Sequence, residues 1–155
     1  MTIALTLQQY LDDQDVPYEV MAHQRTLTAR QTARASGIPA PCLAKAVVLR
    51  DGRGYLMAVL PASCRLDPAQ LRRLLDRPVE LAEEDEAHML FKDCEYGAIP
   101  AVGEAYGLET VVDERLERMP EIWLEAGDHE HLVHLAGERF RGLMAGARHG
   151  SFAHA

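Results

Sequence analysis

The sequence contains very little lysine, few cysteines and no long apolar segment. Only two of its 16 basic residues, Lys45 and Lys92, are lysines. The three cysteines are scattered and form no CxxC pair, which argues against a disulfide framework or a cysteine zinc site and favours a reducing compartment. No apolar stretch approaches the roughly 20 residues that span a bilayer. The N-terminal residues lack the features of a signal peptide, so we expect a cytoplasmic chain without a membrane partner.

Several catalytic motifs are also missing. No GxSxG occurs, and no cysteine lies in a histidine-rich context, so a nucleophile triad is not indicated. No GK[ST] follows the glycine-rich stretch, which excludes a phosphate-binding P-loop. The 155 residues are long enough for one domain with a substantial core.

The net charge of −8 is unevenly distributed. Residues 1–78 hold ten basic and seven acidic side chains, net +3, whereas residues 79–155 hold six basic and seventeen acidic ones, net −11. A basic face that meets a few phosphates is compatible with this pattern, and so is a solvated surface without a partner. The pattern argues against a protein that wraps duplex DNA.

Apolar periodicity and capping residues predict one α+β domain, with a mixed, largely antiparallel sheet and packed helices. Thr28 and Asp67 are expected N-caps, Gly37 a helix stop, and residues 51–54 a hairpin turn. The expected domain covers residues 1–146, and residues 147–155 are expected to form a frayed tail. The predicted helices are 5–11, 28–35, 68–75, 83–91 and 138–145; the predicted strands are 18–21, 46–50, 55–60, 78–81, 110–112, 122–124 and 132–135.

Lys45 opens the apolar strand 46–49, and this position raises a question of function. In a chain that otherwise uses arginine, a lysine can mark a site that needs a compact point charge. The alternative is a strand-edge lysine whose ammonium reaches water. The residue alone leaves both interpretations open.

Two further stretches could carry chemistry. In YGAIPAVGEAYG, residues 96–107, glycines flank Pro100 and would let backbone N–H groups approach a ligand closely, although a plain connecting loop has the same composition. Its small side chains Ala98, Ala101 and Val102 are expected to line a compact pocket at the surface. In AGDHEHLVHL, residues 126–135, the HExxH spacing fails.

The histidines of that second stretch are therefore not expected to bind a metal. On a strand, His129 and His131 would share one face and His134 would lie on the other. Catalytic zinc sites use three protein ligands, and two on one face do not make a site. A histidine facing a pocket or the surface is the expected alternative.

The motifs occur in a recognisable order: TARQTARASGIP, LAKAVVL, YLMAVLP, an Asp-Pro helix, GAIPAVG, VVDE and WLEAG. Over about residues 15–146, this order resembles the YbaK/ProX family of aminoacyl-tRNA deacylases, also found as the editing insertion of bacterial prolyl-tRNA synthetase. The resemblance implies a YbaK-like fold and a cytoplasmic hydrolase. Its substrate would be a mischarged aminoacyl-tRNA ester carrying a small amino acid, and no cofactor is needed.

The resemblance also implies roles for particular residues. Lys45 stands at the family's invariant substrate-contacting lysine and is the expected catalytic residue. The expected substrate-binding residues are Gly97, Ala98, Ile99, Pro100, Gly103, His23, Gly127 and His129. Two matches are loose, because several family members place the loop proline one residue later, and His23 only falls near a position where some relatives carry a tyrosine.

The expected partner is the 3′ end of an aminoacyl-tRNA, and an aminoacyl-tRNA synthetase is a second candidate. The sequence leaves open whether tRNA identity is read by this chain or by such a synthetase. Two alternatives of other classes also stay open: a catalytically silent module that binds an aminoacyl or nucleotide ligand, and a histidine metalloenzyme.

Overall fold

Capping residues fix the ends of two helices, and the first of these contributes residues to the later site. In the computed structural model, which describes residues 3–155, the Thr28 hydroxyl accepts a hydrogen bond from the backbone N–H three residues on, at 3.2 Å. Helix α2 (Ala29–Ser36) begins there and ends at Gly37, whose φ of +69° is left-handed. The Asp67 carboxylate caps α3 (Pro68–Leu75) in the same way. All three expected capping signals are therefore confirmed.

The elements of residues 3–155 follow the predicted order, with short pieces added between them. None of the helices in this described part is long and apolar enough to cross a membrane. Residues 1 and 2 belong to the expected domain but lie outside the described residues. The remaining helices are α1 (Leu5–Asp13), α4 (Glu84–Leu90) and α5 (Gly137–Leu143), with 3-10 helices η1 (Ala40–Cys42), η2 (Gly103–Tyr106) and η3 (Leu116–Arg118). The strands are β1 (Glu19–Ala22), β2 (Leu43–Arg50), β3 (Tyr55–Pro61), β4 (Arg65–Leu66), β5 (Glu80–Leu81), β6 (Glu109–Asp113), β7 (Glu121–Glu125), β8 (His131–Ala136), β9 (Arg148–Gly150) and β10 (Ala153–His154).

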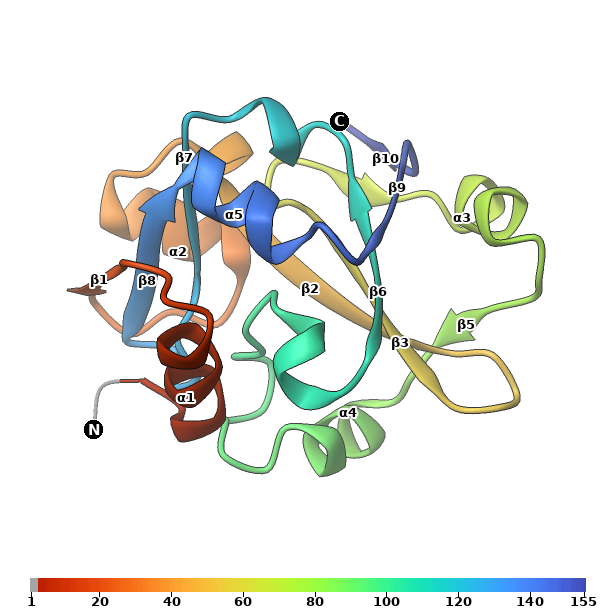
Figure 1. The fold of residues 1–155 in the computed structure, drawn as a ribbon, viewed down its shortest axis with the longest axis horizontal. Helices are drawn as coiled ribbons and strands as arrows, with labels where there is room; N and C mark the ends of the chain where they lie inside the picture. The colour runs from red at the N-terminus through yellow and green to blue at the C-terminus, as the bar shows by residue number, and fades with distance from the viewer. Residues whose placement is uncertain (1–2) are drawn as a thin grey trace.

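The main sheet is mixed, as predicted, and the α+β class is confirmed. Its strand order is β1-β8-β7-β2-β3-β6-β9, and β5 pairs separately with β2 (Figure 1). The pairs β2–β7, β3–β6 and β6–β9 are parallel, and the remaining pairs of this sheet are antiparallel. The parallel pairs join segments far apart in sequence, which local patterns do not reveal.

Helices cover both faces of the sheet. Strand β3 is buried on both sides, because Met57 and Val59 pack with α1, α4 and α5, while Leu56 and Leu60 pack against α3. Helix α2 contributes Ala33 to a third cluster beside the start of β2. The long apolar run of β3 is thus the centre of a three-layer core.

One edge of β2 is left unpaired over part of its length. Strand β7 pairs only with Leu43 and Ala44, and β5 pairs only with Leu49 and Arg50. Within residues 3–155, the stretch 45–47 between these pairings has no strand on that side. Lys45 is the first residue of this gap.

The C-terminal residues are ordered, so the expected frayed tail is wrong. Strand β9 pairs with β6, and β10 pairs with β4. Phe152 is fully buried, and both Phe152 and Ala153 donate backbone hydrogen bonds of 3.0 and 2.9 Å to the Asp113 carboxylate. This anchor lies 39 residues away along the chain, which explains why periodicity in the tail does not predict it.

Candidate functional site

Lys45 lies half-buried on the face of β2 that looks toward α2. Its side chain shares this face with Leu43, because alternate residues of a strand point the same way. The Lys45 ammonium donates a hydrogen bond of 2.6 Å to the carbonyl of Cys64, in the turn after β3. Burial lowers the pKa of Lys45, and the nearby positive charges of Arg30 and Arg65 lower this pKa further. Within residues 3–155, no carboxylate forms an ion pair with this ammonium.

A cavity of about 190 Å³ opens beside Lys45. It lies where β7 ends and the unpaired edge of β2 begins, between the start of α2 and the loop after α4. The backbone around Thr28 forms one wall and the loop residues form the opposite one. The residues that line the cavity are Leu27, Thr28, Ala29, Leu43, Ala44, Lys45, Ala46, Gly97, Ile99 and Glu125.

The glycine-proline loop contributes two of its expected residues to this cavity. Gly97 is exposed and has a φ of +76°. Ile99 is half-buried, and it lines the cavity with a large apolar side chain. Ala98, Ala101 and Val102 are fully buried in the protein. The expectation that these small side chains form a pocket at the surface is therefore wrong, and Ile99 is the loop side chain that lines the cavity.

Two other loop residues lie away from the cavity. Pro100 is buried and is not part of the lining. Gly103 begins η2, and a Cβ at this position would overlap the Thr110 hydroxyl and press on Met57. The structure therefore gives Gly103 a packing reason to be glycine, and it does not place it beside Lys45.

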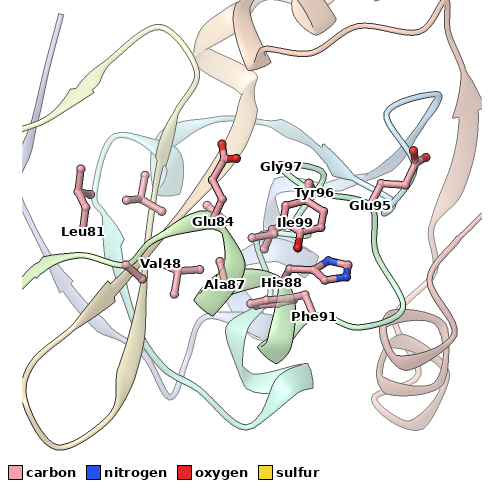
Figure 2. A pocket seen from close by; sticks show the side chains of 13 residues that line it. Val48, Leu81, Glu84, Ala87, His88, Phe91, Glu95, Tyr96, Gly97 and Ile99 are labelled. Carbon is pink, nitrogen blue, oxygen red and sulfur yellow. The ribbon is translucent and has the colours of Figure 1, made fainter.

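A second cavity, of about 280 Å³, lies on the other side of the loop (Figure 2). Ala46, Gly97 and Ile99 line both cavities, so they separate one space from the other. In the second cavity, His88 of α4 stacks on Tyr96 with ring centroids 4.1 Å apart. Its walls are otherwise largely apolar.

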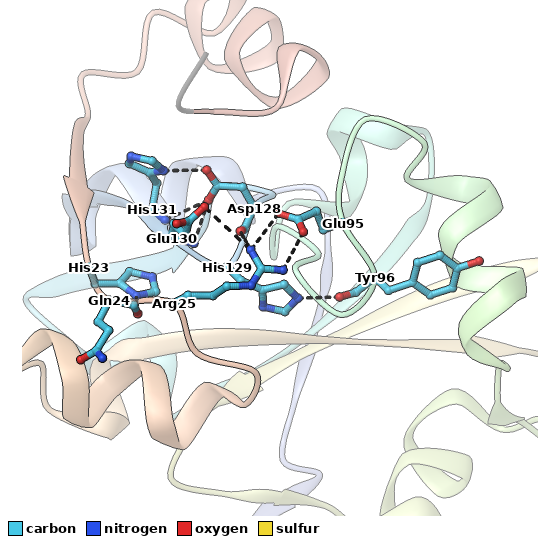
Figure 3. A network of polar contacts seen from close by, with 9 residues as sticks. All are labelled: His23, Gln24, Arg25, Glu95, Tyr96, Asp128, His129, Glu130 and His131. Atoms are coloured by element: carbon cyan, nitrogen blue, oxygen red, sulfur yellow. Dashed lines mark hydrogen bonds and ion pairs between the residues drawn. The ribbon is translucent and has the colours of Figure 1, made fainter.

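A polar network fixes the base of the loop (Figure 3). His129 is buried in a turn before β8 with φ +64°, and its Nε2 lies 2.5 Å from the Tyr96 carbonyl oxygen. Arg25 forms an ion pair of 2.7 Å with Glu95 and donates to the Asp128 carbonyl at 3.2 Å. Two separate segments, one with Arg25 and one with His129, thus hold the residues that precede Gly97.

The remaining predicted binding residues do not line the cavity. The His23 Nδ1 lies 2.7 Å from the Gln24 carbonyl, and Gly127, at φ +121°, packs against Ala4. His129 supports the loop through its contact with the Tyr96 carbonyl oxygen. Of the predicted site, the structure therefore brings together Lys45, Gly97 and Ile99.

The expected strand alternation fails for the histidines. His129 is in the left-handed turn and not on β8, so it shares no strand face with His131. His131 contacts the Asp128 carboxylate at 2.6 Å, and His134 stacks on Trp123. Residues 3–155 contain no group of three or more histidine, cysteine or acidic side chains arranged to hold a metal ion.

Glu125 is a charged cavity residue that the sequence analysis missed. It follows the predicted strand 122–124, where a charged residue suggests only a solvent-exposed strand end, and in the structure it is the last residue of β7. In the structure it lines the cavity, and burial together with the charge of Asp128 raises its pKa to about 7. The Thr32 hydroxyl acts weakly in the opposite direction.

The fold and site define an α+β domain with a lysine-containing cavity at an open strand edge. The family model described as the aminoacyl-tRNA editing domain matches residues 23–143 of this sequence. The chain belongs to this family, which confirms the resemblance stated above. No match was found among the curated proteins.

Solved structures of similar fold cover nearly the whole chain. One is described as a candidate trans-editing enzyme for prolyl-tRNA synthetase; it has a TM-score of 0.83 and 24% identity, over 98% of this chain and 97% of its own. Another, described as a hypothetical protein, has a TM-score of 0.83 and 18% identity, over 96% and 99%. A candidate signal transduction protein from Marinobacter aquaeolei has a TM-score of 0.79 and 27% identity, over 97% of this chain but 31% of its own.

Proposed function

We propose that this protein hydrolyses the ester bond between a small amino acid and the 3′-terminal adenosine of a mischarged tRNA. The observation that carries the proposal is the half-buried ammonium of Lys45 in a small cavity of a chain from the aminoacyl-tRNA editing domain family. The 190 Å³ cavity is compatible with a short aminoacyl side chain. The protein described as a candidate trans-editing enzyme for prolyl-tRNA synthetase supports the same reaction class.

The charges around the cavity suit the end of a tRNA. Lys45 and the nearby Arg30 and Arg65 form a local cluster of positive charge in a protein whose net charge is negative. Such a cluster attracts a phosphate or a developing oxyanion without binding duplex DNA in general. Burial is the main cause of the lowered Lys45 pKa, and a bound anion would offset the second cause, repulsion from Arg30 and Arg65.

The reaction requires little from the protein beyond positioning and electrostatics. Water attacks the ester carbonyl carbon, the bond to the ribose oxygen breaks, and that oxygen takes up a proton. The products are the free amino acid and the tRNA 3′ hydroxyl. Lys45 would stabilise the negative charge that develops on the ester oxygen or would anchor the terminal phosphate. The base that activates water is either a protein group or a hydroxyl of the substrate.

Deacylation of a panel of mischarged tRNAs tests the proposal. We expect turnover of alanyl-, seryl-, cysteinyl- or prolyl-tRNA and little turnover of leucyl- or phenylalanyl-tRNA. Comparable rates for phenylalanyl- and alanyl-tRNA would contradict the size limit. Zinc analysis and chelator treatment in the same assay test the metalloenzyme alternative.

A catalytically silent binding module is the second candidate function. The structure from Marinobacter aquaeolei supports it, because there the similar fold makes up 31% of a longer chain described as a candidate signal transduction protein. Binding of an aminoacyl-adenosine analogue without turnover of any tRNA in the panel would favour this alternative.

A further inference from the structure

Lys45 and Glu125 sit side by side at the end of a parallel strand pair. The pairing between β2 and β7 ends with Ala44 opposite Leu124, and each charged residue is the next one along its strand. Their side chains leave the sheet on the same face, because residues in register on parallel strands point the same way. Both side chains line the 190 Å³ cavity.

The two charges nevertheless do not neutralise each other. The Lys45 ammonium is directed to the Cys64 carbonyl at 2.6 Å, and no ion pair within 4.0 Å joins it to Glu125 among the residues that the structure describes. The Thr32 hydroxyl interacts with the Glu125 carboxyl group and lowers its pKa, but the Oε2 atom of this group is buried and has no hydrogen-bond partner in the described structure. A buried carboxylate oxygen without a partner is unfavourable, since it has lost its water and gained nothing in return.

A positively charged ligand group would satisfy this oxygen. Apart from Lys45, the residues that line the cavity with Glu125 carry no charge, and Asp128 adds a second negative charge near Glu125. The cavity therefore has a cationic side at Lys45 and an anionic side at Glu125. An aminoacyl ester has the matching polarity, with an ammonium on its α-carbon and negative charge at the phosphate and at the developing oxyanion.

We propose that Glu125 binds the α-ammonium group of the aminoacyl ester, so that the site selects substrates with a free α-amino group. This inference rests on the proposed function and adds the part of the substrate that is recognised. Glu125 would orient the ester relative to Lys45, because the ammonium is only two bonds from the carbonyl carbon. It would also exclude acyl groups that lack a positive charge.

Binding of two matched analogues tests this role directly. The probes are adenosines whose 3′ oxygen is replaced by an amide nitrogen that carries either an alanyl or a lactyl group, which have nearly the same size but differ in ammonium versus hydroxyl. We expect the wild-type protein to bind the alanyl analogue about 10–100-fold more tightly, the range of a charge-assisted hydrogen bond in a buried site. The Glu125→Gln variant should lose this preference while it keeps the shape of the side chain.

A control on the same strand separates this effect from a general change of charge. Glu121 begins β7 and contacts His134 away from the cavity, so Glu121→Gln should keep the wild-type preference. An equal affinity of the wild-type protein for both analogues, or an unchanged preference in Glu125→Gln, would overturn the inference. A Glu125→Gln variant that keeps the binding preference but hydrolyses alanyl- and lactyl-tRNA equally slowly would assign Glu125 to water activation instead.

The outcomes for binding and hydrolysis are distinguishable. Preferential binding of the alanyl analogue without hydrolysis of alanyl-tRNA would support ammonium recognition and contradict the deacylase function. Hydrolysis of alanyl- and lactyl-tRNA at equal rates, with equal binding of the two analogues, would support the deacylase function and reject ammonium recognition. Absence of both binding and hydrolysis would reject both.

Discussion

His129 Nε2 lies 2.5 Å from the carbonyl oxygen of Tyr96, so the turn before β8 holds the loop that carries Ile99. His129→Asn keeps a residue that tolerates left-handed backbone but shortens the side chain. We expect it to lower the free energy of unfolding by about 1–2 kcal/mol, through loss of this hydrogen bond. Urea denaturation measures this change, and unchanged stability would contradict the supporting role.

His129→Ala should be less stable still, because alanine at φ +64° adds backbone strain of about 1 kcal/mol. Equal stability of the Asn and Ala variants would show that the left-handed turn rearranges when the histidine is removed.

Lys45→Ala should remain folded and lose activity. Loss of a charge that stabilises the transition state should lower kcat/KM by about 100–1,000-fold. Lys45→Arg should also be impaired, because the wider guanidinium does not fit the place of an ammonium that reaches the Cys64 carbonyl. Lys92→Ala is the matched control, since the other lysine is exposed and lies outside the cavity. Wild-type rates in both Lys45 variants would reject its role.

Ile99 should set the size of the accepted amino acid. It separates the two cavities, so Ile99→Ala would join them and admit larger side chains. We expect the ratio of leucyl- to alanyl-tRNA hydrolysis to rise about tenfold or more. An unchanged ratio would show that the loop does not limit the pocket.

The neighbouring Ala98 provides the contrast. Its side chain is fully buried in the core, so Ala98→Leu should destabilise the fold by about 1–3 kcal/mol through overpacking. Thermal or urea unfolding measures this loss. A stable Ala98→Leu variant with a narrowed substrate range would instead restore the view that small loop residues line the pocket.

The buried Glu125 should make stability depend on pH. Its folded-state pKa of about 7 is above the ordinary value of 4.5, so the folded state binds the proton more tightly than the unfolded state. The contribution of Glu125 to the free energy of unfolding is therefore most favourable below about pH 4.5, and it is lost as pH rises through about 7. Glu125→Gln removes the ionised form and should be more stable than wild type at pH 8.5, by up to about 3 kcal/mol. The wild-type protein and Glu125→Gln should differ little in stability at pH 5. A larger stability difference at pH 5 than at pH 8.5 would contradict the raised pKa of Glu125.

The C-terminal residues should be required for stability. Phe152→Ala removes a fully buried aromatic ring and should lower the free energy of unfolding by about 3–5 kcal/mol. His154→Ala, two residues further on and exposed, should change it by less than about 0.5 kcal/mol. A change of less than about 0.5 kcal/mol for Phe152→Ala would mean that the C-terminal residues do not stabilise the fold.

The sequence predicts the parts of the fold that depend on local interactions. Thr28, Gly37 and Asp67 act within a few residues of themselves, so their capping roles can be read from the sequence. The structure of the C-terminal residues could not be predicted from the sequence, because the Asp113 carboxylate that anchors them lies 39 residues away. The environment of Glu125 likewise depends on parallel pairing with Ala44 and its neighbours, about 80 residues earlier in the chain.

The sequence pattern and the family resemblance both pointed to Lys45 and the glycine-proline loop, but neither indicated which loop side chains line the cavity. That division depends on packing: Ala98 points into the core, and Ile99 points into the cavity. Because the small side chains of this loop pack into the core, a loop rich in small residues does not by itself predict a small pocket.

The unpaired stretch 45–47 of β2 has a consequence for solubility. An open strand edge is a template on which another chain can add a strand, and a charged residue on such an edge opposes this. The ammonium of Lys45 stands at the first position of the gap, next to an otherwise apolar run. We therefore expect the residue proposed to contact the substrate to oppose edge-to-edge self-association as well.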